Sequence, residues 1–241
     1  MRLHAIQHVP FEGTALIAEW AADRGHELTS ALALTEEYPA CDEVDLLVVL
    51  GGPMDADDET ASPWLHAEKH YLVECIAAGR GVLGICLGAQ ILAEVLGGKI
   101  RRNAHREIGW YAVEKTEDGK AERLFSAWPE CFVTGQWHGD TFDLPDGLPP
   151  LMSSEACANQ AFVFDRRVVG LQFHLEWTEN ELRAMLAAAG DALKSPGLWT
   201  MSASEIEDEA PERIAFNREL LFELLDTLAV EVAVRVAETV L

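Results

Sequence analysis

Cys86 lies at the centre of the segment Gly84-Ile85-Cys86-Leu87-Gly88, with a glycine two residues away on either side. The short aliphatic run Gly81–Ile85 precedes it, and a stretch with helical periodicity follows. Such glycines let the chain turn sharply from strand to helix, so that the central side chain projects above the sheet. The start of the helix would direct its positive end and free N–H groups at the sulfur and favour the thiolate. The segment indicates a cysteine nucleophile, and a buried structural cysteine is the alternative that it leaves open.

His174 and Glu176 could serve this thiol as base and orienting carboxylate. Both lie in Gln172-Phe173-His174-Leu175-Glu176, at the end of a run of β-type residues. Residues two apart on a strand face the same side, so imidazole and carboxylate can meet. A thiol nucleophile needs a base, and the base needs an acceptor that fixes its tautomer. Alone, this spacing is a weak pattern that is more commonly a satisfied surface pair; the partnership with Cys86 favours a catalytic one.

The first half of the chain supplies elements that could position these groups. Strands are predicted at Arg2–Val9, Asp45–Leu50 and Gly81–Ile85, and helices at Thr14–Arg24, Pro63–Ala78 and Leu87–Leu96. The alternation of strands and helices predicts an α/β fold with a mainly parallel sheet and helices on both faces.

The second half has a different pattern. Strand-like segments at Tyr111–Lys115, Cys131–Trp137, Ala161–Phe164 and Val168–Phe173 predict an antiparallel extension of the sheet. Helices are expected at Glu179–Leu193, Ser202–Glu209 and from Pro211 onward, with a break at Lys194–Gly197. We therefore expect one α/β domain over residues 1–193 and a helical extension over 194–241 packed on it. Its leucines at helical spacing (220, 221, 224, 225 and 228) would face the core, with a homodimer interface as the alternative.

Composition excludes several classes of function. Forty-one acidic against 18 basic residues leave a net charge of -23, which argues against binding nucleic acid or an anionic membrane. No apolar run approaches the ~18 residues of a membrane span, and the N-terminus lacks a signal peptide. The five cysteines are scattered without a CxxC pair, so neither a disulfide framework nor a zinc site is expected, and a reduced, cytoplasmic location fits.

Two other groups of polar residues are interpreted as solvated. The acidic residues 55, 57, 58 and 59 have no recognisable ligand spacing, and a solvated loop is favoured over a cation site. His66 and His70 lack a third ligand and are interpreted as surface residues. Glu107–Trp110 is expected to enter a strand near the site. No metal or organic cofactor is expected.

Four motifs together resemble class I glutamine amidotransferases. Gly84–Gln90 and Gln172–Glu176 are similar to the family's two signatures, and Gly51-Gly52-Pro53 to its oxyanion strand. Trp137-His138-Gly139-Asp140 resembles its substrate loop, most closely the version in the amidotransferase domain of GMP synthase. All four occur in family order between residues 45 and 177. The resemblance implies a flavodoxin-like three-layer sandwich.

The resemblance also implies a mechanism. Cys86 would attack the side-chain amide of glutamine or of a γ-glutamyl compound, and His174, oriented by Glu176, would protonate the departing amine and then activate water. The N–H groups of Gly52 and Leu87 would form the oxyanion hole. The implied holders of the substrate's α-groups are Gln90, Trp137, His138, Gly139 and Asp140, although Gln90 could simply be polar on a helix face and the loop an ordinary turn.

Two residues depart from the family pattern. Leu175 replaces the usual proline without affecting the triad, whereas the bulky Trp137 replaces a smaller residue and leaves the substrate open.

Three functions are compatible with this resemblance. The protein could be a stand-alone hydrolase, a glutaminase subunit that delivers ammonia to a separate synthetase polypeptide, or a non-catalytic binding or regulatory protein on the same fold. The complete triad speaks against the third. Related intracellular cysteine peptidases have a similar cysteine turn but lack a His-x-Glu pair at this distance after the cysteine.

Overall fold

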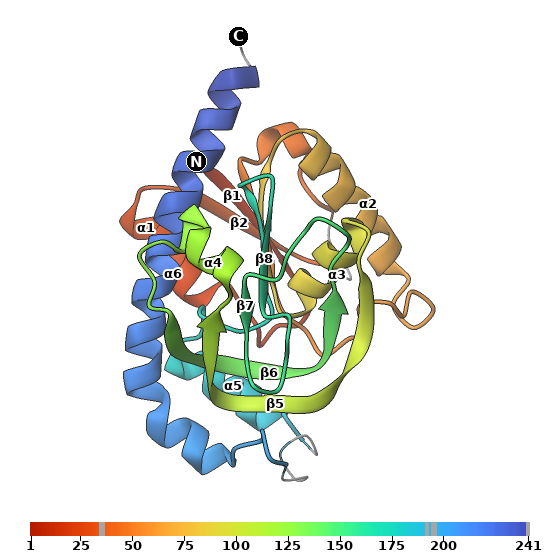
Figure 1. Ribbon diagram of the computed structural model, residues 1–241. Coiled ribbons are helices and arrows are strands. Elements are labelled where there is room, and N and C mark those ends of the chain that lie inside the picture. The colour runs from red at the N-terminus through yellow and green to blue at the C-terminus, as the bar shows by residue number, and fades with distance from the viewer. Residues whose placement is uncertain (34–36, 191–192, 194–196, 240–241) are drawn as a thin grey trace.

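The computed structural model describes residues 1–33, 37–190, 193 and 197–239, and within them a nine-stranded sheet forms the centre of the molecule (Figure 1). The strand order is β2-β1-β3-β4-β9-β8-β7-β5-β6. The strands are β1 (Arg2–Gln7), β2 (Glu27–Leu32), β3 (Leu46–Val49), β4 (Gly81–Ile85), β5 (Lys99–Lys115), β6 (Cys131–Asp143), β7 (Met152–Ser153), β8 (Ala161–Phe164) and β9 (Val168–Leu171).

The sheet has a parallel and an antiparallel part. Strands β2, β1, β3, β4 and β9 are parallel neighbours. From β9 through β8, β7 and β5 to β6, each pair is antiparallel. Strands β5 and β6 form a long curved ribbon, with a register shift between Arg102 and Glu107 (Figure 1). The predicted parallel sheet with an antiparallel extension is confirmed.

Helices cover both faces of the sheet, which gives the expected three layers (Figure 1). They are α1 (Ala15–Asp23), α2 (Trp64–Ala77), α3 (Leu87–Val95), α4 (Glu117–Ala121), α5 (Glu179–Ala188) and α6 (Ala203–Thr239), with short 3-10 helices η1 (Cys41–Glu43) and η2 (Arg123–Phe125). Alternation along β3 explains the layers: Leu46 and Val48 pack in a core with α1 and α6, whereas Leu47 and Val49 pack with α2 and α3. No helix in the described part of the chain is long and apolar enough to cross a membrane.

Helix α6 differs from the prediction, which placed a helix at Ser202–Glu209 and a new one from Pro211. The structure has a single helix that continues through Pro211. Proline removes one helical hydrogen bond, but packing on either side compensates: Ile206 lies in one core cluster and Leu221 in another. Asp226 also accepts hydrogen bonds from Trp20 in α1 and from Arg24 just after it.

The predicted boundary between residues 193 and 194 stays a prediction. The expected helix from Glu179 ends earlier, at Ala188, and residues 194–196 of the predicted break lie outside the described part of the chain.

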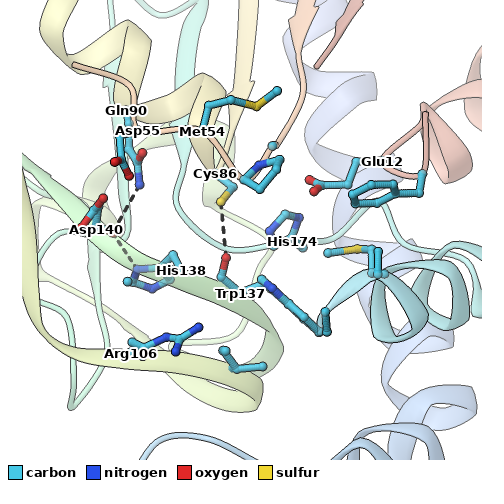
Figure 2. A pocket seen from close by; sticks show the side chains of 18 of the residues that line it. Glu12, Met54, Asp55, Cys86, Gln90, Arg106, Trp137, His138, Asp140 and His174 are labelled. Atoms are coloured by element: carbon cyan, nitrogen blue, oxygen red, sulfur yellow. Dashed lines mark hydrogen bonds between the residues drawn. The ribbon is translucent and has the colours of Figure 1, made fainter. Parts of the chain in front are cut away.

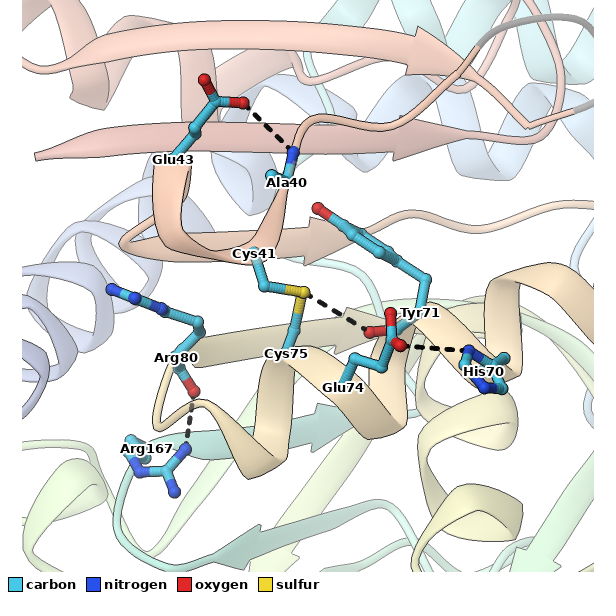
Figure 3. Close-up of a disulfide and its surroundings, with 9 residues drawn as sticks. All are labelled: Ala40, Cys41, Glu43, His70, Tyr71, Glu74, Cys75, Arg80 and Arg167. Carbon is cyan, nitrogen blue, oxygen red and sulfur yellow. Dashed lines mark hydrogen bonds and ion pairs between the residues drawn. A yellow bond between two sulfur atoms is a disulfide. The ribbon is translucent and has the colours of Figure 1, made fainter.

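A disulfide joins Cys41 in η1 to Cys75 in α2, and the expectation of reduced cysteines is therefore wrong for this pair (Figure 3). The two residues are 34 positions apart, but their Cα atoms lie 5.2 Å from each other. The loop before β3 folds against α2, and this tertiary contact leaves no sign in the cysteine spacing. Cys86, Cys131 and Cys157 are free.

Candidate active site

Cys86 occupies a sharp turn between β4 and α3. Its backbone has φ 53° and ψ -108°, which is unusual for a residue with a side chain. Its amide N–H donates to the carbonyl of Leu171 in β9 (2.8 Å), which anchors the turn to the sheet. Gly88 is required here because a Cβ on it would collide with the backbone carbonyl of Val49. The strained turn and its glycine thus present the thiol at the carboxyl edge of the parallel strands.

His174 and Glu176 form a buried pair just beyond β9. The Nδ1 atom of His174 lies 2.6 Å from Oε1 of Glu176, whose other oxygen accepts from the N–H of Leu175 (3.0 Å). Trp177 stacks on the imidazole, with 4.4 Å between ring centroids. The Nε2 atom is buried, has no hydrogen-bond partner among the described residues, and belongs to a side chain that faces Cys86 in the cavity (Figure 2).

These surroundings favour the charged form of His174. Burial by itself lowers the pKa of an imidazole, but the carboxylate of Glu176 and the interaction with Cys86 outweigh it and raise the pKa of His174 well above its ordinary value. Sulfur, imidazole and carboxylate can therefore act as a nucleophile, a proton carrier and its orienting group.

A second buried histidine fixes the Gly51–Gly52 peptide beside this pair. The Nδ1 atom of His8 lies 3.0 Å from the carbonyl oxygen of Gly51 and must donate, because a carbonyl only accepts. Its Nε2 atom lies 3.1 Å from Glu68, and both side chains are inaccessible to solvent. Burial lowers the pKa of His8, but the hydrogen bond and charge of Glu68 outweigh it, and the pKa is raised. Since N–H and C=O of a trans peptide point in opposite directions, the N–H of Gly52 is held away from His8.

Cys86 and His174 line a cavity of about 370 Å³, shown in Figure 2. Of the other sequence-predicted residues, Gly52, Gln90, Trp137, His138, Gly139 and Asp140 also line it. Glu176 lies behind His174, and Leu87 begins α3 directly after the cysteine. The structure therefore brings together the residues that the motifs singled out.

Residues 137–140 are tied to Cys86 and α3. The carbonyl oxygen of Trp137 lies 3.7 Å from the sulfur. Gln90 donates to the carbonyl of Asp140 (3.3 Å), and the carboxylate of Asp140 pairs with Arg102 (2.9 Å). The backbone from 137 to 140 thus forms one wall of the cavity.

The His138 side chain connects this wall to a polar network. Its Nδ1 donates to the carbonyl of Asp140 (2.8 Å) and its Nε2 lies 2.9 Å from Glu107, which also accepts from Ser154 (2.7 Å). Possible metal-ligand atoms of Glu107, His138 and Cys157 lie within 4.8 Å of one another. Since hydrogen bonds already engage these groups, the cluster is suited to stiffening the backbone of residues 137–140.

Sequence reasoning missed several residues of the cavity. Glu12, from the loop between β1 and α1, projects into it (Figure 2). Asp55, assigned above to a solvated loop, lines it close to Asp140, and burial together with the Asp140 charge raises the pKa of Asp55. Met185 of α5 contributes an apolar wall. Ile108 also lines the cavity, so Glu107–Trp110 lies in a strand near the site as expected, but in the middle of β5 and not at its entry.

Comparison with known proteins agrees with this geometry. The family model for class I glutamine amidotransferase matches residues 16–189. The chain belongs to the class I glutamine amidotransferase family.

Among individual relatives of this class I amidotransferase, the glutamine amidotransferase-like protein YfeJ of Salmonella typhimurium is 33% identical over 191 residues, 77% of this chain and 80% of YfeJ. The GMP synthase of Aliivibrio salmonicida is 31% identical over 168 residues, but the match spans only 30% of that longer protein. A glutamine amidotransferase structure from Thermotoga maritima has a TM-score of 0.85 at 33% identity, and covers 95% of this chain and 97% of its own.

Proposed function

We propose that this amidotransferase-family protein hydrolyses the side-chain amide of glutamine or of a γ-glutamyl compound through a thioester on Cys86. The observation that carries the proposal is the orientation of His174. One of its ring nitrogens is held by Glu176, and the other has no hydrogen-bond partner of good geometry among the described residues and lies in the cavity that contains the sulfur, whose interaction with the imidazole helps to raise the pKa of His174. A histidine in this arrangement can receive a proton and return it to a substrate.

In the first half of the reaction, the Cys86 thiolate bonds to the amide carbon. The N–H groups of Gly52 and Leu87 donate to the oxyanion that develops on the carbonyl oxygen. When the tetrahedral intermediate collapses, the C–N bond breaks, and His174 gives its proton to the departing nitrogen. Ammonia or an amine leaves, and a γ-glutamyl thioester remains on the sulfur.

In the second half, water attacks the thioester carbon while neutral His174 takes one of its protons. The C–S bond then breaks, and glutamate is released with the Cys86 thiolate and the imidazolium restored. We assign the substrate's α-amino and α-carboxylate groups to the side of the cavity formed by Gln90 and the 137–140 backbone, where Asp140 and Arg102 offer both charges.

A second candidate function is a glutaminase subunit that delivers ammonia to a separate synthetase. The match to part of GMP synthase favours it, since that protein is named for glutamine hydrolysis. The same Cys86 chemistry would serve both functions, and the two differ in whether a partner binds. A non-catalytic role is disfavoured because Cys86, His174 and Glu176 are all present and adjacent.

The test compares Cys86→Ala with Cys131→Ala, which removes an exposed free cysteine outside the cavity. Release of glutamate from glutamine and from γ-glutamyl amides is measured for both. We expect Cys86→Ala to lose at least about 10³-fold in kcat, and Cys131→Ala to retain wild-type turnover. A glutamine-like electrophile should label Cys86 and not Cys131. Turnover retained by Cys86→Ala would remove the thioester mechanism.

To separate the two candidate functions, we would purify the tagged protein from its native cells. A co-purifying synthetase that raises glutaminase activity would support the subunit, and turnover of a γ-glutamyl amide that needs no partner would support the hydrolase.

A further inference from the structure

Glu12 places a carboxylate in the cavity beside the catalytic pair. It follows β1 in a loop, and its side chain points toward Cys86 and His174 (Figure 2). A Cβ added to Gly51 would collide with the carboxylate of Glu12 and would lie close to the imidazole of His174, so both side chains lie directly beside this glycine. Neither the motifs nor the family resemblance pointed to this residue.

This carboxylate differs from the other acidic groups around the site. Asp140 is paired with Arg102 and Glu176 with His174, whereas no hydrogen bond or ion pair of the Glu12 side chain is found among the described residues. Burial raises the pKa of the Glu12 carboxyl, which the charge of His174 only partly offsets. A partly desolvated carboxylate without a partner is unfavourable, so a cationic ligand that entered the cavity would gain from meeting it.

The position of Glu12 indicates which part of a substrate it would meet. Figure 2 shows Glu12 on one side of Cys86 and His174, and Gln90, Asp55 and Asp140 on the other. In the proposed reaction the α-groups of the γ-glutamyl unit occupy the Gln90 and Asp140 side. The leaving nitrogen approaches Nε2 of His174, and any group attached to that nitrogen must extend away from the α-groups, toward Glu12.

The walls on that side suit an aminoalkyl chain. Phe11, which precedes Glu12 in the chain, lines the cavity together with Trp137 and Met185; the three belong to one apolar cluster that offers surface for methylene groups. Aromatic rings also attract an ammonium group that lies over their faces. Glu12 then provides a single negative charge for the end of such a chain.

We propose that Glu12 forms a leaving-group subsite that recognises γ-glutamyl amides whose amine carries a second, positively charged amino group. This inference rests on the proposed function and specifies its substrate class. The bond changes are unaltered: Cys86 takes the γ-glutamyl group, His174 protonates the departing nitrogen, and a diamine leaves in place of ammonia.

The rival interpretation is that Glu12 only stabilises the imidazolium of His174. The two interpretations differ in one measurable ratio. A group that acts through His174 changes the turnover of every substrate by a similar factor, whereas a group that binds the distal ammonium changes only substrates that have one.

The experiment compares two substrates of nearly equal length, the γ-glutamyl amide of 1,4-diaminobutane and that of butylamine. Their kcat/KM values are measured for the wild type, for Glu12→Gln and for Glu19→Gln. Glu19 lies in α1 outside the cavity and pairs with Arg218, so this control removes the same charge elsewhere. The wild type and Glu19→Gln should favour the ammonium substrate by about 10-fold or more, the scale of one well-placed charge pair. Glu12→Gln should bring the ratio close to one.

A wild-type ratio near one, or an equal loss on both substrates in Glu12→Gln, would overturn the subsite while leaving the thioester mechanism in place. Failure to hydrolyse either amide or glutamine, with no label on Cys86, would overturn the proposed function as well. A thermal melt of Glu12→Gln checks that the isosteric change leaves the fold intact.

Discussion

Two buried imidazole–carboxylate pairs lie beside the same peptide, yet only one is suited to catalysis. The carbonyl of Gly51 accepts from His8, whose other nitrogen meets Glu68. His174 also lies close to Gly51, since a Cβ added to this glycine would be 3.3 Å from the Cε1 atom of His174. The Nδ1 atom of His174 meets Glu176. Both histidines are buried, and each has a pKa raised chiefly by its glutamate against the effect of burial. Burial and a shifted pKa therefore do not by themselves identify a catalytic histidine.

The partner of the second ring nitrogen makes the difference. In His8 that nitrogen donates permanently to a carbonyl, which turns the pair into a support for the backbone. In His174 it has no partner among the described residues and faces a cavity. The proton on Nδ1 of His8 is fixed, whereas a proton on Nε2 of His174 can be given to a substrate. This contrast predicts different consequences when each pair is broken.

The largest effect is expected from Glu176→Gln. The amide oxygen of the substituted side chain can still accept from Nδ1 of His174, but the negative charge that raises the pKa of His174 is lost. The wild type should stay active until the pH rises through this raised pKa, where the imidazolium deprotonates. In Glu176→Gln, kcat should fall by about 10²–10⁴-fold, and the alkaline limb of the pH profile of kcat/KM should move to lower pH. An alkaline limb at the wild-type position would mean that Glu176 does not control the charge of His174.

An intermediate effect is expected from matched variants of His8. In His8→Asn the amide nitrogen can take the place of Nδ1 and still donate to Gly51, whereas in His8→Gln it can take the place of Nε2 and meet only Glu68. We expect His8→Gln to lose about 10–100-fold in kcat, because the Gly52 N–H is no longer held in place. His8→Asn should stay within about threefold of the wild type. Equal losses in both would contradict the role of the Gly51 contact.

His8→Gln also tests how the protonation of His8 contributes to the stability of the fold. Because the pKa of His8 is raised, the pair contributes its full stability below the ordinary pKa of an imidazole, and this is lost as the pH rises through the raised value. Breaking a buried pair costs about 3–5 kcal/mol. The difference in free energy of unfolding between the wild type and His8→Gln, measured by urea denaturation, should therefore shrink at alkaline pH.

The sequence predicted most of the parallel half of the fold, because that half is built from local patterns, but it missed the edge strand β2 (Glu27–Leu32), whose residues are mostly exposed. The helix expected at Pro63–Ala78 is Trp64–Ala77, and Gly81–Ile85 is a strand as expected. The antiparallel half was harder: β5 runs from Lys99 to Lys115, whereas a strand was predicted only over Tyr111–Lys115, with Glu107–Trp110 as its entry. Its first residues are mostly polar and exposed, and they are held in the strand by pairing with β6.

The candidate site divides in the same way. Cys86 and His174 were found because motifs with fixed spacing surround them. His8 and Glu12 were missed because their positions depend on residues distant in the chain, such as Glu68. No local pattern distinguishes such residues from any other polar residue after a strand, and only the packed structure reveals which peptide or cavity they reach.

The smallest effect is expected from a third pair, His138 with Glu107. Both nitrogens of His138 are engaged, one with Glu107 and one with the carbonyl of Asp140. This resembles His8 and predicts a role in holding the 137–140 wall, to which we assign the substrate's α-groups. His138→Gln, which can keep the contact to Glu107 but not the one to Asp140, should raise KM for glutamine by about 3–10-fold with kcat nearly unchanged. His138→Asn, which can keep the Asp140 contact, should raise it less. If His138→Gln lost kcat as severely as Glu176→Gln, a fully engaged histidine would be taking part in proton transfer, and the free-nitrogen criterion for His174 would fail.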